Sequence, residues 1–162
     1  MIERRLLAIY LGDHLAGSTG GVELARRARD SGRDGNWGKP LAELCAEIEA
    51  DRTTLVAIAD ELGIKPNPAK LAAAWSGEKL GRLKLNGRLV SHSPLSLVVE
   101  MEMLLLGITG KLGMWRILEQ TLGAEVAGAD IPRLIERAEA QRQVVDRIRL
   151  AAAAEAFAAE AA

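Results

Sequence analysis

Cysteine is almost absent from this sequence of 162 residues, since Cys45 is the only one. A single cysteine excludes an intrachain disulfide and any metal site built from several cysteines. Aromatic residues are also scarce, and valine and isoleucine give way to alanine, leucine, glutamate and arginine. Because these abundant residues favour helices over sheets, the composition predicts an all-α fold.

The chain also lacks an excess of charge of either sign, because its 21 basic and 22 acidic residues sum to −1. A general nucleic-acid binder would carry a global positive charge, so we expect no nucleic-acid partner. The most apolar run, residues 95–106, contains Glu100 and Glu102, so we expect no membrane span. No signal-peptide cleavage site follows the short apolar stretch that ends at Asp13. We therefore expect a soluble, cytoplasmic protein.

Proline and glycine mark the ends of five expected helices within one domain that spans residues 1–162. Three helix starts place an N-cap side chain shortly before a proline: Asn67-Pro68, Ser93-Pro94 and Asp130-Ile131-Pro132. Gly63 and Gly123 each follow a leucine and are typical of helix C-termini. The expected helices cover roughly residues 2–30, 40–62, 67–85, 93–122 and 130–158.

The end of the third expected helix has a second interpretation. Residues 82–91 alternate about Asn86-Gly87, which is a strong signal for a β-hairpin. We favour a helix end at Asn86-Gly87, because a lone hairpin would have no sheet to join in a helical chain.

The fourth expected helix is apolar nearly all round, which predicts a central position in an up-down bundle. Glycines are frequent in the first and fourth helices and each costs helix stability, so we expect them to permit a close approach between helices: Gly12, Gly17, Gly20, Gly21, Gly107, Gly110 and Gly113.

Several charged side chains interrupt the apolar stripes of these helices. Asp51 stands in the stripe of the second helix, and Glu47 lies one turn before it. The other members of this expected buried set are Asp13, His14, Glu100, Glu102 and Arg142, with Arg142 as the counter-ion of Asp51, Glu100 or Glu102.

We interpret this set as a hydrogen-bonded buried network, and the alternative is a site for iron, manganese or zinc. A di-iron centre of the ferritin type needs a Glu-x-x-His pair on each of two helices. His14 and His92 are instead preceded at that spacing by Leu11 and Leu89, so no cofactor is predicted.

A second candidate site lies just before the fourth expected helix and would bind a small anion such as a phosphate or carboxylate. It consists of Arg82, Lys84, Arg88, His92 and the N-cap Ser93. The alternative is a basic surface that faces the acidic second helix, because residues 39–66 sum to −3 and residues 67–92 to +4.

Several short strings resemble a family of uncharacterised actinobacterial proteins of similar length: His14-Leu15-Ala16-Gly17, residues 21–27, residues 81–88, Ser93-Pro94-Leu95-Ser96, Glu100-Met101-Glu102 and Gly110-Lys111. The resemblance implies a helical cytoplasmic protein of bacterial origin and no established activity. The expected architecture is similar to the ferritin-like helical bundle, which does not by itself imply iron.

These observations predict a non-enzymatic helical bundle for protein interaction or for binding a small anion or other ligand. We also expect a homodimer, because an all-round apolar helix suits packing across a two-fold axis. The alternative is an atypical ferritin-like metal protein that uses carboxylates and histidine for oxidoreductase or hydrolytic activity.

Overall fold

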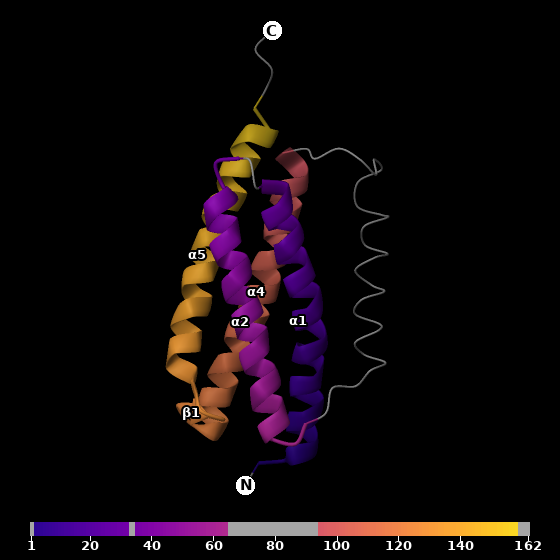
Figure 1. Cartoon of the computed structure of the whole chain (residues 1–162), viewed down its shortest axis with the longest axis vertical. Coiled ribbons are helices and arrows are strands. Elements are labelled where there is room, and N and C mark those ends of the chain that lie inside the picture. Colours follow the sequence, from indigo (N-terminus) through magenta and orange to yellow (C-terminus); the bar gives the residue numbers. More distant parts are fainter. Residues whose placement is uncertain (1, 33–34, 65–93, 159–162) are drawn as a thin grey trace.

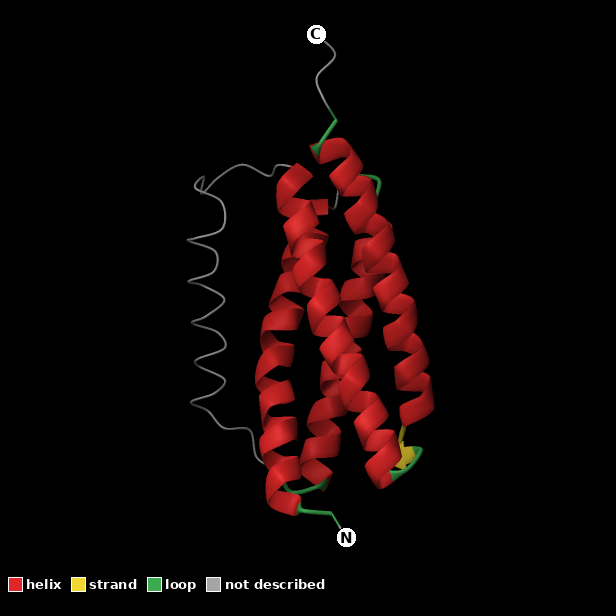
Figure 2. Cartoon of the chain, turned by 180° about the vertical axis from the view of Figure 1, so that it is seen from behind, coloured by secondary structure: helices red, strands yellow, loops and turns green. Residues whose placement is uncertain are grey.

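The computed structural model describes residues 2–32, 35–64 and 94–158. Four helices run side by side along one long axis (Figures 1 and 2). They are α1 (Arg4–Gly32), α2 (Gly38–Glu61), α4 (Pro94–Leu122) and α5 (Ile131–Ala156). The predicted all-α class is therefore confirmed, with four helices in the described residues. The helix expected at 67–85 and the helix-or-hairpin question at residues 82–91 lie outside them.

Several of the predicted helix signals act as expected. The carboxylate of Asp130 accepts a hydrogen bond of 3.1 Å from the backbone N–H of Arg133, and Pro132 lies in the first turn of α5. Gly63 and Gly123 adopt φ angles of 70° and 105° where α2 and α4 end. Glycine reaches this left-handed region without the steric cost of a Cβ atom, so these helix ends are encoded locally.

A short β-hairpin between α4 and α5 was not expected from the sequence. Strands β1 (Glu125–Val126) and β2 (Ala129–Asp130) pair antiparallel around a two-residue turn. The turn residues Ala127 and Gly128 have φ angles of 55° and 72°. Positive φ at both positions is the geometry of the type I′ turns that join two strands tightly. The usual sequence signal for that turn is Asn-Gly. Because Ala127 stands at the first position, the sequence does not carry this signal.

The helices form two antiparallel pairs, α1 with α2 and α4 with α5, and α2 and α4 run in the same direction (Figure 1). The α4–α5 interface is the most extensive and the α1–α2 interface is next. Contact between the pairs is mainly between α1 and α4, while the neighbouring helices α2 and α5 make few contacts. The α2–α5 side therefore leaves space for long polar side chains.

The core joins residues from all four helices around Trp115 of α4. The stripe of α2 that contains Asp51 is buried, including Ile58, and so is the apolar stripe of α5 that includes Ile148. On α1, the buried face includes Leu11, Leu15, Val22 and Ala25. The prediction that Asp13 faces the interior is wrong, because Asp13 is exposed.

Helix α4 packs against both α1 and α5, yet it is not covered on all sides. Met103, Leu106 and Ile117 keep 51%, 68% and 42% of their surface exposed. The apolar composition of this helix therefore exceeds what packing in the described bundle requires. Among the described helices, none is long and apolar enough to span a bilayer.

Candidate functional site

Among the residues that the structure describes, one carboxylate is almost completely buried inside the bundle, that of Asp51 on α2, which is 2% exposed. Arg137 of α5 donates from Nε to Oδ1 at 2.8 Å and makes a second contact through Nη2. Lys111 of α4 forms an ion pair with Oδ2, and Gln141 of α5 donates to the same oxygen at 3.1 Å. Both oxygens of the buried carboxylate therefore have partners, as burial of a charge requires.

Lys111 and Gln141 extend this network toward the surface. The ammonium of Lys111 donates to Gln141 Oε1 at 2.6 Å, and Gln141 Nε2 donates to Glu47 Oε2 at 3.0 Å. Burial lowers the pKa of Lys111 from its ordinary value, the carboxylate of Asp51 opposes that shift, and Arg137 adds to it. The network connects α2, α4 and α5, and it includes α2 and α5, which make few contacts otherwise.

The counter-ions of Asp51 differ from the one that the sequence suggested. Arg142 is exposed, and Lys111 and Arg137 hold the carboxylate instead. A usable signal for Arg137 was present, because it precedes Gln141 by one helical turn and Gln141 stands in the apolar stripe of α5. Two polar side chains one turn apart on that face can reach the same buried partner.

The other carboxylates of the expected set lie elsewhere. Glu100 pairs with Arg27 at 2.8 Å, and the exposed Glu102 lies 3.7 Å from Arg149. Glu47 is exposed and contacts the network through Gln141 alone. Throughout residues 2–32, 35–64 and 94–158, no group of three or more His, Cys, Asp or Glu side chains is arranged to hold a metal ion.

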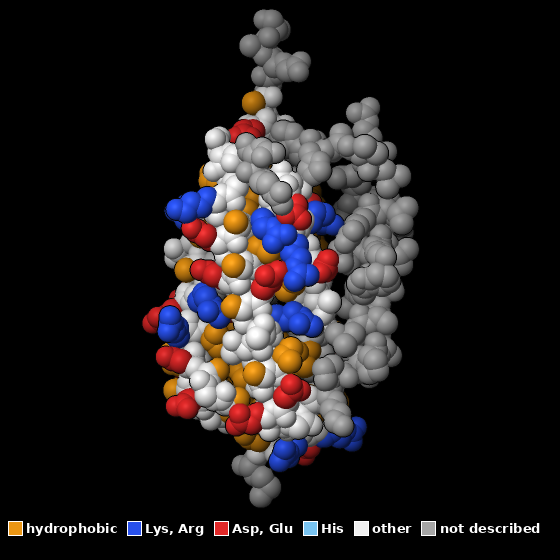
Figure 3. Space-filling view, in the orientation of Figure 1, with side chains coloured by type: hydrophobic (Ala, Val, Ile, Leu, Met, Phe, Trp, Pro, Cys, Tyr) orange, Lys and Arg blue, Asp and Glu red, His pale blue; other side chains and the backbone are white. Residues whose placement is uncertain are grey.

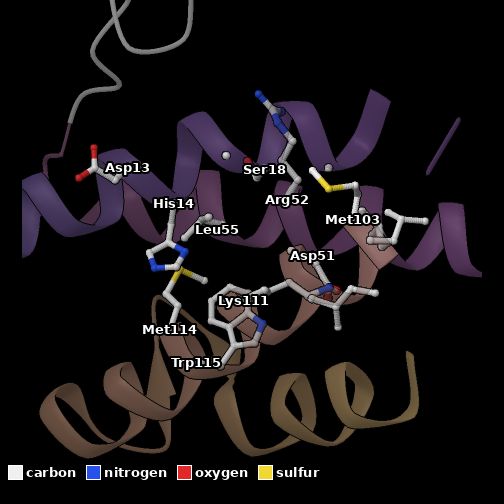
Figure 4. Close-up of a pocket in the computed structure, with 17 residues that line it drawn as sticks. Asp13, His14, Ser18, Asp51, Arg52, Leu55, Met103, Lys111, Met114 and Trp115 are labelled. Atoms are coloured by element: carbon white, nitrogen blue, oxygen red, sulfur yellow. Dashed lines mark hydrogen bonds and ion pairs between the residues drawn. The ribbon is translucent and has the colours of Figure 1, made fainter. Parts of the chain in front are cut away.

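A pocket of about 260 Å³ lies between α1, α2 and α4, beside this network. Its lining is mostly apolar, with Ile48 and Leu55 from α2 and Leu104, Ile108 and Met114 from α4. Lys111 and Trp115 line it from α4, as does His14 from α1 (Figure 4). The pocket therefore combines an apolar body with a few polar side chains, which is the usual composition of a small-molecule site.

Glycines create part of this space. Gly17 and Gly21 of α1 and Gly107 and Gly110 of α4 line the pocket, and a Cβ atom added at any of them would meet no described atom within 4 Å. The expected close helix approach at these positions is therefore not found. The missing side chains instead leave the space between α1 and α4 open.

Trp115 supplies an unpaired hydrogen-bond donor at the pocket. Its side chain is completely buried, and its indole Nε1 has no hydrogen-bond partner in the described part of the chain. Leaving a buried donor unpaired costs about 1–3 kcal/mol, so such groups are rare in folded proteins. A bound acceptor would remove this cost.

His14 enters the pocket from α1, and the neighbouring Asp13 also lines the pocket, with its carboxylate turned away from the His14 ring (Figure 4). The ring of His14 lies edge-on to that of Tyr10, with 4.7 Å between the ring centroids. Burial lowers the pKa of His14, and the nearby Asp13 opposes this shift. The imidazole is therefore neutral at pH 7 and provides one donor and one acceptor.

The expected anion site cannot be placed, because Arg82, Lys84, Arg88, His92 and Ser93 all lie outside the described residues. Basic and acidic side chains are interspersed over the face of the bundle in Figure 3.

In comparisons with known proteins, no protein family, no curated protein and no solved structure matches this chain.

Proposed function

We propose that this protein is a non-enzymatic helical bundle that binds a small, mostly apolar molecule in the pocket between α1, α2 and α4. The observation that carries the proposal is that Trp115 lines the pocket while its buried indole N–H has no partner among the described residues. An acceptor atom on a ligand would satisfy this group.

The size and lining of the pocket support the proposal. An apolar cavity of about 150 Å³ accepts benzene. The pocket between α1, α2 and α4, at about 260 Å³, therefore has room for one ring with a short substituent. Met103 and Met114 add flexible side chains that adapt to ligand shape.

The proposal is tested by titrating the ¹⁵N-labelled protein with toluene and following the indole N–H signal of Trp115 by NMR. We expect a saturable shift of that signal in the native protein. Gly107→Leu should abolish the shift, because the new side chain enters open space at the pocket lining.

Gly113→Leu is the matched control, since Gly113 lies on the same helix, does not line the pocket and also has no described atom within 4 Å of an added Cβ. Binding that is lost in both variants, or in neither, would contradict the assignment of the pocket.

A second candidate function is assembly into a homodimer through α4. The exposed side chains of Met103, Leu106 and Ile117 favour it, because large apolar groups on a helix surface often mark an interface. Light scattering at micromolar concentration should give a dimer that Leu106→Glu converts to a monomer. Leu150→Glu on α5 is the control, because Leu150 is similarly exposed. A native protein that is monomeric would contradict this candidate.

The ferritin-like architecture and the cytoplasmic location also belong to this proposal. The shared direction of α2 and α4 supports the ferritin-like architecture, because bundles of the ferritin type contain one long crossover connection.

The separate positions of the carboxylates do not favour the metal-protein alternative. Protein purified without an affinity tag should therefore contain no stoichiometric iron, manganese or zinc by elemental analysis, and finding one of these metals would overturn the non-metal assignment.

A further inference from the structure

The polar groups around the pocket differ in whether their hydrogen-bonding capacity is used. Ser18 donates its hydroxyl hydrogen to the backbone oxygen of Leu15 at 2.8 Å. The acceptor oxygens of Asp51 are occupied by Lys111, Arg137 and Gln141. Asp13 and Arg52 line the pocket with opposite charges, and Figure 4 shows their charged ends turned away from Lys111 and Trp115. None of these residues offers a free group to a ligand beside Lys111 and Trp115.

Two side chains on α4 have an N–H group without an acceptor among the described residues. The ammonium of Lys111 carries three N–H groups, and its contacts in the described part of the chain are with Asp51 and Gln141. One N–H of Lys111 is therefore unused. The indole N–H of Trp115 is also unused, and Trp115 follows Lys111 by one helical turn on the same face. The polar side of the pocket on α4 thus offers donors to a ligand and no free acceptor.

The charge balance of the network also favours an anion. Two cations, Lys111 and Arg137, share the buried carboxylate of Asp51, which leaves a formal charge of +1 among these three side chains. Glu47 is the next nearest carboxylate of the network, but it is exposed and contacts Gln141, so water screens it. His14, on the opposite wall, is neutral at pH 7 because burial lowers its pKa.

From the proposed ligand-binding function we infer the ligand class: a small monocarboxylate with an apolar body. Its carboxylate accepts hydrogen bonds from the indole N–H of Trp115 and from the third N–H of Lys111. Its apolar body lies among Ile48, Leu55 and Ile108. This arrangement pairs the unpartnered donor and neutralises the excess positive charge with one ligand group.

The inference is tested by calorimetric titration at pH 7 with three probes that share one ring: phenylacetate, its neutral analogue phenylacetamide, and the cation 2-phenylethylamine. We expect phenylacetate to bind at least about tenfold more tightly than phenylacetamide, because hydrogen bonds to a charged group contribute more than those between neutral groups. We expect 2-phenylethylamine to bind most weakly, because it brings a positive charge to a positive site.

Two variants locate the carboxylate. Trp115→Phe keeps an aromatic ring and removes the N–H, so it should weaken phenylacetate binding about tenfold and leave toluene binding unchanged. Lys111→Met keeps the Asp51–Arg137 pair and removes the excess charge, so it should abolish the preference for phenylacetate over phenylacetamide. If the second variant fails to bind toluene, its pocket is not intact and Trp115→Phe decides the question.

The outcomes separate this inference from the function on which it rests. Equal affinity for phenylacetate and phenylacetamide, with toluene still bound, would overturn the carboxylate assignment alone. Phenylacetate binding that survives Gly107→Leu would place the anion elsewhere and would also overturn it. Failure of all the probes, toluene included, would overturn the proposed ligand-binding function.

Discussion

Lys111 and Asp51 lie 60 residues apart in the sequence and form an ion pair in the interior of the bundle. Their side chains are 16% and 2% exposed, so little water is present to solvate the pair. The pair connects α4 to α2, while Arg137 and Gln141 connect the same carboxylate to α5. Because Lys111 also lines the pocket, one residue links the stability of the bundle to the proposed binding site.

We predict that Asp51→Asn lowers the free energy of unfolding by about 3 kcal/mol. The substitution is nearly isosteric but leaves the ammonium of Lys111 and the guanidinium of Arg137 without their shared anion, and breaking a buried pair costs roughly 3–5 kcal/mol. Urea denaturation followed by circular dichroism measures the loss.

Glu47→Gln is the matched control for this substitution, because it also removes one carboxylate charge from α2. Glu47 is exposed, so this variant should change stability by less than about 0.5 kcal/mol. Similar losses in both variants would show that burial of the Asp51 pair does not determine its contribution.

His14 should make the stability of the protein depend on pH. Burial lowers its pKa below the ordinary value of 6.5, so the folded state favours the neutral ring. The stabilisation is fully present above the pKa of the unfolded state and is lost as the pH falls through the lower pKa of the folded state. His14→Gln removes this titration, so the native protein should lose more stability than the variant between pH 7.5 and pH 5 in urea denaturation. Parallel losses in the two proteins would contradict this role of His14.

Local signals in the sequence predicted the fold well where a single residue determines the backbone. Helix ends depend on signals that act within a few residues, so they can be predicted without knowledge of the tertiary structure. Examples are the N-cap at Asp130 with its following proline and the left-handed glycines Gly63 and Gly123. The positive φ of Ala127 has no such signal, since alanine rarely adopts it. The hairpin was therefore missed.

The candidate site was less predictable because it depends on which helices are neighbours. The apolar stripe of α2 identified Asp51 as an interior charge, but its partners come from α4 and α5. Asp13 and His14 are adjacent in sequence, and only the rotation of α1 about its axis determines that His14 faces the pocket. Periodicity restricts such choices to one side of a helix and does not select between adjacent residues.

Replacing a glycine of α4 with alanine should stabilise the protein. Gly107→Ala should raise the free energy of unfolding by about 1 kcal/mol, because alanine is the better helix former and its Cβ meets no described atom within 4 Å. Gly32→Ala should lower stability, because its Cβ would overlap Cδ1 of the buried Leu41. Thermal denaturation of the two variants compares them directly. A lower melting temperature for Gly107→Ala would show that the space at the pocket lining is already filled.

The turn between β1 and β2 carries backbone strain at Ala127, whose φ of 55° lies in the left-handed region. The left-handed conformation costs a residue with a Cβ atom roughly 1–2 kcal/mol. The cost is lower for asparagine, because its short side-chain amide forms a hydrogen bond with the local backbone. Ala127→Asn should therefore raise the free energy of unfolding by up to about 1 kcal/mol by creating the Asn-Gly pair that type I′ turns favour. Ala127→Val should lower it, because a β-branched side chain is a steric outlier at positive φ. Thermal denaturation distinguishes the two variants, and a change in the same direction for both would mean that packing of this side chain, rather than backbone strain, controls the turn.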